Sequence, residues 1–204
     1  MEASGIILAG GRSLRLGYDK ILETVGSRSL LEIVVDSISS LCGDIIVVTA
    51  EGHPISSPGH YPGLRIVTDI YPGKGPLGGI YTGLQISNTY CNLVVAADMP
   101  FLNQALLHYM IELTDGFDMV TPRVEGKVEP LHSVYTGGCL RVIEQMFERG
   151  ELGVHKLLPL VKARYVEVDE IVRFDPEQLS FFNVNTEKDL QKARKLSGGD
   201  RYDD

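Results

Sequence analysis

The chain has 204 residues, of which 44% are hydrophobic and 23% charged, the composition of a globular protein of ordinary size. Its formal net charge of −8 argues against general binding to nucleic acids or anionic membranes. No apolar stretch reaches the roughly 18 residues of a membrane span, and the three cysteines lie too far apart for a zinc or disulfide framework. We therefore expect a cytoplasmic protein with reduced thiols.

Apolar runs alternate with amphipathic stretches, which predicts repeated β-α units around a mainly parallel sheet. The expected strands are residues 5–8, 44–49, 64–68, 92–97, 118–121, 131–135, 164–168 and 181–184. The expected helices are residues 29–41, 103–114, 138–148, 153–161 and 187–196, with one more running from the glycine-rich stretch 71–80 to about residue 87. We expect one α/β domain over residues 1–196 and a polar, frayed tail over 197–204.

The first loop, residues 8–20, combines glycines with basic residues directly after a short apolar run. Glycines at positions 10, 11 and 17 let the backbone wrap a polyanion and present its N–H groups to it. Cations suited to phosphate oxygens come from Arg12, Arg15 and Lys20. This combination predicts a loop that holds a nucleoside triphosphate, and the alternative is a tight turn whose basic side chains are merely solvated.

Two common phosphate-binding motifs do not fit this loop. A P-loop needs Lys directly after its second glycine, whereas Gly17 is followed by Tyr18 and Asp19. A dinucleotide fingerprint needs the spacing G-x-G-x-x-G, which the stretch from Gly10 to Arg15 lacks. The loop therefore belongs to another class of nucleotide site.

Asp98 directly follows the apolar run 92–97, and Met99-Pro100 would turn the chain sharply after it. Ligands of open parallel sheets bind beyond the carboxyl ends of such strands. A lone carboxylate together with phosphate oxygens is a usual way to hold Mg²⁺, so we predict Asp98 as a metal ligand. The alternative is that Asp98 caps the helix near residue 103, a role for which Asn103 is better placed.

Two other groups of polar residues lie at the ends of expected strands. Asp69 ends a strand at the same sheet edge, where it could contact a nucleotide, act as a second electrostatic partner of the metal, or simply form the turn before Pro72. Alternation places Asn183 and Asn185 on one face of the strand expected at 181–184. Their amides offer donors and acceptors to a ligand, and the alternative is that they stabilise the turn into the last helix.

The stretch L-A-G-G-x-S-L-R-L-G-x-D-K, residues 8–20, resembles the signature loop of nucleotidyltransferases, above all the molybdenum cofactor guanylyltransferases. Residues 97–100 match that family's Asp-x-Pro metal-binding motif, and residues 183–190 resemble its Asn-Val-Asn-Thr stretch. Residues 75–80 resemble its Gly-Pro-Leu-Ala-Gly segment, where a cytidylyl-transferring sister group has a serine-rich stretch, so guanine is favoured. Leu16 replaces the usual Met, and Glu187 stands where Pro is frequent.

The resemblance implies a three-layer, Rossmann-like nucleotidyltransferase fold and Mg²⁺-dependent transfer of GMP from GTP to the phosphate of molybdopterin. Nucleotide-binding residues would then be Leu8, Ala9, Gly10, Gly11, Lys20, Asp69, Gly78 and Asp98. Catalysis would rest on Lys20, Asp98 and Arg15, since fixed cations stabilise charge that builds on a transferring phosphate. The molybdopterin acceptor would meet Asn183 and Asn185, while His132, in a segment that resembles the acceptor side, is given no proton-transfer role.

The resemblance also names GTP and molybdopterin as partners and leaves room for transient contacts with other cofactor-biosynthesis proteins or apo-molybdoenzymes. Two alternatives stay open at this point. One is a related transferase that uses CTP or another phosphorylated acceptor. The other is a nucleotide-binding or cofactor-binding module without catalysis, against which the joint presence of Lys20 and Asp98 speaks.

Overall fold

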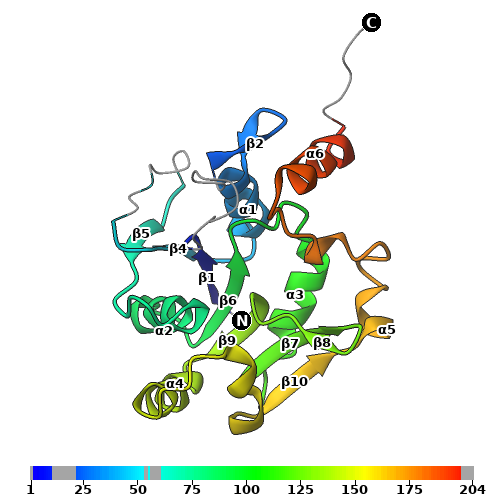
Figure 1. The fold of residues 1–204 in the computed structure, drawn as a ribbon. Coiled ribbons are helices and arrows are strands. Elements are labelled where there is room, and N and C mark those ends of the chain that lie inside the picture. The colour runs from blue at the N-terminus through cyan, green and yellow to red at the C-terminus, as the bar shows by residue number, and fades with distance from the viewer. Residues whose placement is uncertain (1, 11–21, 53–54, 56–60, 199–204) are drawn as a thin grey trace, which may run out of the picture.

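The computed structural model describes residues 2–10, 22–52, 55 and 61–198 (Figure 1). Its strands are β1 (Ala3–Leu8), β2 (Thr24–Val25), β3 (Arg28–Ser29), β4 (Asp44–Thr49), β5 (Leu64–Thr68), β6 (Cys91–Ala96), β7 (Met119–Val124), β8 (Lys127–Val128), β9 (His132–Thr136) and β10 (Ala163–Val166). Its α-helices are α1 (Leu30–Ser39), α2 (Pro76–Ile86), α3 (Gln104–Glu112), α4 (Cys139–Glu148), α5 (Val168–Ile171) and α6 (Glu187–Leu196). Short 3₁₀ turns are η2 (Val154–Lys156), η3 (Leu158–Leu160) and η4 (Leu179–Phe181).

The main sheet has the strand order β10-β7-β9-β6-β1-β4-β5, with β8 paired to β7. Neighbouring strands on this path run parallel except at β9, which is antiparallel to both β6 and β7. The predicted mainly parallel sheet is thus confirmed. Among the described residues, the helices are too short or too polar to cross a bilayer.

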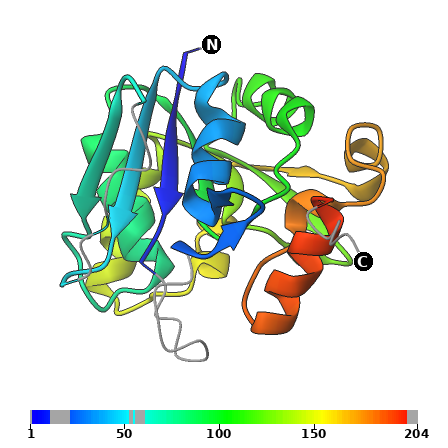
Figure 2. The same cartoon turned by 90° about the horizontal axis from the view of Figure 1, so that it is seen from above.

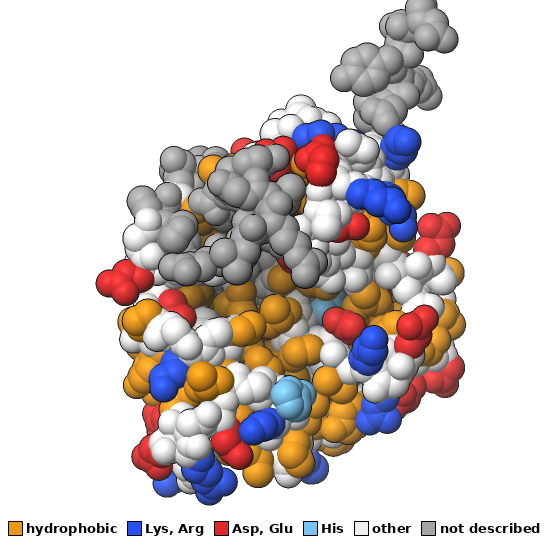
Figure 3. All heavy atoms as spheres, in the orientation of Figure 1, with side chains coloured by type: hydrophobic (Ala, Val, Ile, Leu, Met, Phe, Trp, Pro, Cys, Tyr) orange, Lys and Arg blue, Asp and Glu red, His pale blue; other side chains and the backbone are white. Residues whose placement is uncertain are grey.

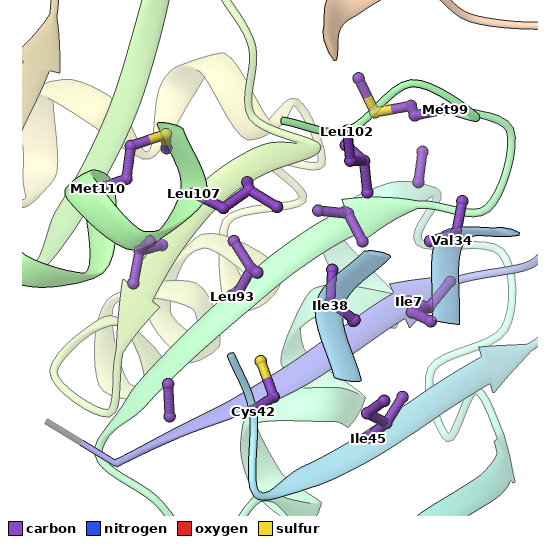
Figure 4. Close-up of a cluster of buried hydrophobic side chains, with 14 of the residues drawn as sticks. Ile7, Val34, Ile38, Cys42, Ile45, Leu93, Met99, Leu102, Leu107 and Met110 are labelled. Atoms are coloured by element: carbon purple, nitrogen blue, oxygen red, sulfur yellow. The ribbon is translucent and has the colours of Figure 1, made fainter. Parts of the chain in front are cut away.

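Helices cover both faces of the sheet, giving three layers (Figure 2). One face of β1 and its neighbours packs against α1 and α3, as the close-up in Figure 4 shows with Ile7, Ile38, Leu93 and Leu107. The opposite face, which includes Ile6, packs against α2 and α4. Because successive strand residues point to opposite faces, the adjacent isoleucines of β1 supply both cores at once.

The direction in which the sheet grows reverses at β1. From β1 the chain passes through α1 to β4 and then to β5, while β6, reached through α2, lies on the other side of β1. Helices α1 and α2 also cover opposite faces. In open α/β sheets, ligands bind at such a reversal, beyond the carboxyl ends of the strands. The fold therefore predicts a ligand-binding site at the carboxyl ends of β1 and β6.

Side-chain caps set where several helices begin. Ser29 accepts a hydrogen bond from the Glu32 amide, and the Glu32 carboxylate accepts one from the Ser29 amide, which lowers the pKa of Glu32. Thr186 and Asp189 form the corresponding box at α6. Gly75, at a φ of 61°, precedes α2, and this left-handed backbone favours glycine.

Three predicted elements are wrong or incomplete. Residues 181–184 form no strand, because the chain turns through η4 and its amides bond back to residues 178 and 179. The helix expected at 153–161 is instead the pair η2 and η3, with Pro159 inside the second turn. The strand expected at 164–168 ends at 166, where α5 soon follows. The short pair β2–β3, strand β8 and α5 were not predicted.

Helix α2 lies so close to β1 that position 83 has room only for glycine. A Cβ atom there would lie 2.5 Å from Ile6 Cγ2 and 2.9 Å from Ile6 Cδ1. Gly83→Ala should raise helix propensity by up to about 1 kcal/mol but strain the core by roughly 1–3 kcal/mol. We expect a net loss of stability, read as a lower thermal midpoint, by about 2–4 °C per kcal/mol for a chain of this size.

In an Ile6→Ala background the new methyl group has space, so the same substitution should then cost little. A Gly83→Ala variant that unfolds at or above the midpoint of the unaltered protein would contradict the close packing of α2 on β1.

Candidate functional site

The carboxyl ends of β1, β4, β5 and β6 lie level at one edge of the sheet. Just past the strands, the Ala9 amide donates to the Val48 carbonyl at 2.8 Å, and the Ala97 amide donates to the Leu8 carbonyl at 3.1 Å. The Asp69 amide donates to the Thr49 carbonyl at 2.8 Å. The structure thereby brings Leu8, Ala9, Gly10, Asp69 and Asp98 to the same edge.

Gly10 lets the first loop leave β1 close to the end of β4. A Cβ atom at Gly10 would lie 3.2 Å from the Ala50 amide nitrogen, which is tighter than an ordinary contact. Beyond it, the predicted site residues Gly11, Arg15 and Lys20 lie outside the described residues. The described start of the loop thus fits the close backbone approach that a phosphate-binding loop requires.

Asp98 is held from two sides. Met99, the next residue, is 2% exposed and packs into the core between the sheet and α3 (Figure 4). The Asp98 carbonyl accepts a hydrogen bond from the Val184 amide at 2.9 Å. Asn103, not Asp98, caps α3, since its side chain accepts from the Leu106 amide at 3.0 Å. The half-buried Asp98 side chain therefore lies at the sheet edge and is not the cap of α3.

The donor set at this edge suits a hard cation that shares its coordination with a substrate. Within the described ranges no group of three or more His, Cys, Asp or Glu side chains could hold a metal ion by itself. Mg²⁺ is usually bound by one or two carboxylates together with phosphate oxygens and water. Asp98 fits that arrangement, whereas a structural zinc or calcium cage would need more protein ligands.

Asp69 is fixed by the first turns of α2 and by its own loop. Its Oδ1 accepts hydrogen bonds from the Tyr71 amide at 2.9 Å and from the Thr82 hydroxyl at 2.8 Å. A Cβ atom at Gly78 would lie 3.0 Å from Asp69 Oδ2 and 2.8 Å from the Tyr71 carbonyl oxygen. Gly78 and Asp69 therefore form one surface. Sequence reasoning missed Thr82, although its spacing of four residues from Gly78 on a helix is the signal that could have found it.

Aromatic packing anchors the loop that follows Asp69. The Tyr71 ring meets the Tyr81 ring edge-on at 5.0 Å and stacks on Phe147 of α4 at 5.1 Å. The Tyr81 hydroxyl donates to Glu144 at 2.6 Å, and burial, with this bond, raises the pKa of Tyr81 to about 12. The cluster holds the Asp69 loop between α2 and α4, so the backbone that carries Asp69 is not free to swing.

The predicted acceptor residues Asn183 and Asn185 flank the buried Val184. The sequence predicted a strand here, but the two asparagines do not lie on one. Asn183 is half-buried and donates to the Phe181 carbonyl at 3.0 Å, and Asn185 is exposed. The hydrogen bond from Val184 to Asp98 nevertheless places this segment beside the end of β6. The structure thus brings the two asparagines near Asp98 through backbone pairing rather than through strand geometry.

His132 begins β9 opposite Val95, at the same edge of the sheet. It is completely buried, and its ring lies 4.8 Å from that of Phe181, just before the asparagine segment. Burial lowers the pKa of His132 from 6.5 to about 4, although the Asp175 carboxylate and the Ser180 backbone act in the opposite direction. A neutral, packed imidazole fits a structural support for this segment.

Comparison with known proteins places this geometry in a family. The model of the MobA-like NTP transferase domain matches residues 5–167. A probable molybdenum cofactor guanylyltransferase from Pelotomaculum thermopropionicum is 36% identical over 201 residues, which cover 98% of this chain and 96% of that protein.

Solved structures share the fold. The crystal structure of molybdopterin-guanine dinucleotide biosynthesis protein A from Archaeoglobus fulgidus superposes with a TM-score of 0.82 at 25% identity, covering 96% of this chain and 98% of that one. A Mycobacterium tuberculosis protein, crystallised in complex with manganese, has a TM-score of 0.68 at 13% identity, covering 96% and 99% of the two chains. At that identity the second likeness concerns the fold alone.

The buried His132 predicts a pH dependence of stability. Its folded-state pKa of about 4 lies below the ordinary value of 6.5, so the unfolded chain takes up the proton first as the pH falls. The free energy of unfolding therefore keeps the full contribution of neutral His132 above pH 6.5. Between pH 6.5 and pH 4 it falls by roughly 1 kcal/mol per pH unit.

Urea unfolding at pH 7 and pH 5 checks this expectation against a His132→Phe variant, which has no group to protonate. The drop in unfolding free energy from pH 7 to pH 5 should be smaller in the variant. Equal drops in both proteins would show that His132 is not held neutral by burial.

Proposed function

This chain belongs to the family of MobA-like NTP transferases, and we propose that it acts as a molybdenum cofactor guanylyltransferase. It transfers GMP from GTP to the phosphate of molybdopterin, giving the guanine dinucleotide and pyrophosphate. What supports this function most strongly is the meeting of Asp98, Asp69 and the Leu8–Gly10 loop at one sheet edge, in a chain similar over nearly its full length to guanylyltransferases.

Asp98 is the residue that would hold the metal, and we assign Mg²⁺ to it on the chemistry of its surroundings. A single carboxylate at the edge of the sheet leaves the remaining coordination positions to phosphate oxygens and water. When bound there, Mg²⁺ supplies Lewis-acid polarisation of the phosphate and neutralises charge. Met99 in the core and the Val184 amide fix the backbone of Asp98, so its carboxylate is held at the strand end where the metal would bind.

The first loop supplies the cations. In Figure 3, hydrophobic side chains occupy much of the middle of the face shown, with Lys, Arg, Asp and Glu side chains among and around them. An enzyme with a net charge of −8 must bring positive charge to the triphosphate locally. We assign that role to Lys20 and Arg15, which oppose the charge that builds on the non-bridging oxygens and on the leaving pyrophosphate. Both lie outside the described residues.

Residues 69–80 are proposed to receive the nucleoside. Gly78 lets the Asp69 loop pack directly on the first turn of α2, since a Cβ atom there would lie 2.8 Å from the Tyr71 carbonyl oxygen, and this places the Asp69 carboxylate beside the start of that helix. The absence of a serine-rich stretch at 75–80 favours guanine over cytosine. A transferase that uses CTP or another phosphorylated acceptor is the alternative within the same fold.

The acceptor side is proposed to include Asn183 and Asn185. Their amides can donate to and accept from the edge of a pterin, and the Val184–Asp98 hydrogen bond keeps them close to the metal-binding strand end. In-line displacement requires the molybdopterin phosphate to attack the α-phosphorus from the side opposite the leaving pyrophosphate. Transient contacts with other cofactor-biosynthesis proteins or apo-molybdoenzymes would serve delivery of molybdopterin and release of the product.

Pyrophosphate release measures this function directly. GTP, CTP and ATP are each supplied with Mg²⁺, with and without molybdopterin, and we expect release only with GTP and molybdopterin together. Release with CTP instead would overturn the assignment of guanine to residues 75–80. If folded protein releases no pyrophosphate from any of the three nucleotides in the presence of intact molybdopterin, the chain uses another acceptor or is a non-catalytic module.

Asp98→Asn should lower kcat/KM for GTP by on the order of 10²–10³-fold, the usual cost of removing a group that stabilises transition-state charge. The amide keeps the shape of the side chain, so the thermal midpoint should stay close to that of the unaltered protein. Asp115→Asn, at an exposed aspartate between α3 and β7, is the matched control and should leave kcat/KM unchanged. Full activity in Asp98→Asn would remove Asp98 from the mechanism.

A further inference from the structure

The hydroxyl of Thr82, in α2, contacts the carboxylate of Asp69. Thr82 is completely buried, at 0% exposure. Its Oγ1 donates to Asp69 Oδ1 at 2.8 Å and accepts from the Ile70 amide at 3.1 Å. A buried hydroxyl that bonds to a carboxylate and to the adjacent backbone fixes both the side chain and the loop that carries it.

The two oxygens of Asp69 therefore differ. Oδ1 accepts both the Thr82 hydroxyl and the Tyr71 amide. Oδ2 faces Gly78, where a Cβ atom would lie 3.0 Å away. Both protein donors bond to Oδ1, so Oδ2 is the carboxylate oxygen that remains for a ligand, and the Asp69 side chain is only half-buried.

We propose that Thr82 is a positioning residue of the nucleotide site, which acts by holding Asp69 so that Oδ2 accepts a hydrogen bond from the bound nucleoside. This inference rests on the proposed function, because it takes GTP as the ligand. An ionised carboxylate is only an acceptor, so its partner is an N–H or O–H donor. GTP offers two kinds in reach of such a group, the N–H donors of the guanine edge and the ribose hydroxyls.

Thr136 provides a matched comparison. It is also 0% exposed, and its hydroxyl donates to the Asp118 carbonyl at 3.1 Å and accepts from the Gly138 amide at 3.3 Å. Thr136 pairs with Cys91 at the start of β6, at the opposite edge of the sheet. Both threonines thus bury a hydroxyl with two partners, but only Thr82 touches a proposed nucleotide residue.

Steady-state kinetics with GTP separate positioning from simple support of the fold. Thr82→Val keeps the shape and removes the hydroxyl, and we expect the KM for GTP to rise about tenfold, as for the loss of one hydrogen bond to a charged group, with kcat within about twofold. Thr82→Ser keeps the hydroxyl and should restore the KM to within about twofold. Thr136→Val should lower the thermal midpoint and leave the KM unchanged.

The same variants, assayed with ITP and with 2′-deoxy-GTP, test two of these donors. An effect of Thr82→Val that disappears with ITP, which lacks the exocyclic amino group, assigns the donor to that amino group. An effect that disappears with 2′-deoxy-GTP assigns it to the 2′-hydroxyl. Either result supports positioning through Asp69.

A combined variant tests whether Thr82 acts through Asp69. In an Asp69→Ala background, Thr82→Val should change the KM for GTP no further, because the carboxylate it positions is gone. A further tenfold rise there, or an unchanged KM in Thr82→Val alone, would overturn the inference. Both results require the unaltered protein to turn over GTP, so inactivity of that protein would instead contradict the proposed function.

Discussion

The site depends on the parallel pairing of β1 with two neighbours at once. Leu8 stands opposite Val48 of β4 and Ala96 of β6, so three strands end level and their following residues meet. Register is protected because Ile6 and Ile7 pack into different cores. A slip by one residue would exchange the faces of both side chains. The same apolar residues that stabilise the fold therefore align the polar residues beyond it.

A second constraint joins distant parts of the chain at this edge. Val184 packs with Leu30 of α1 and Leu190 of α6 in a small separate cluster, while its amide bonds to the Asp98 carbonyl. Phe181 contacts the buried His132 ring. Together these contacts hold the C-terminal asparagine segment against the carboxyl end of β6 and the first residue of β9. A transferase needs both substrates within reach of one centre, and these contacts place the proposed acceptor residues beside the proposed metal ligand.

Much of this arrangement could be predicted from the sequence, for reasons that are local. The runs that form β1, β4 and β6 are apolar and rich in branched residues, which favours buried strands. The predicted cap Asn103 is a short polar residue placed directly before a helical pattern. Asp69 and Asp98 could be placed at one edge because the carboxyl ends of parallel strands share it.

The remaining features depend on tertiary contacts that periodicity does not reveal. Residues 181–184 have the composition of a strand, but Asp175 accepts the Leu179 and Ser180 amides and turns the chain before them. The bond from Thr82 to Asp69 joins residues 13 apart in the sequence. Strands β2 and β3 have two residues each, too few for a pattern.

Anomalous diffraction from crystals grown with Mn²⁺ and a non-hydrolysable GTP analogue tests most directly whether these strand ends form the nucleotide and metal site. Mn²⁺ takes the same oxygen ligands as Mg²⁺ and scatters strongly enough to be located. We predict a manganese peak about 2 Å from an Asp98 carboxylate oxygen, shared with phosphate oxygens of the analogue, whose nucleoside lies over Gly78 and Asp69. Manganese bound away from Asp98, or a nucleoside seated outside the edge formed by β1, β5 and β6, would contradict the account.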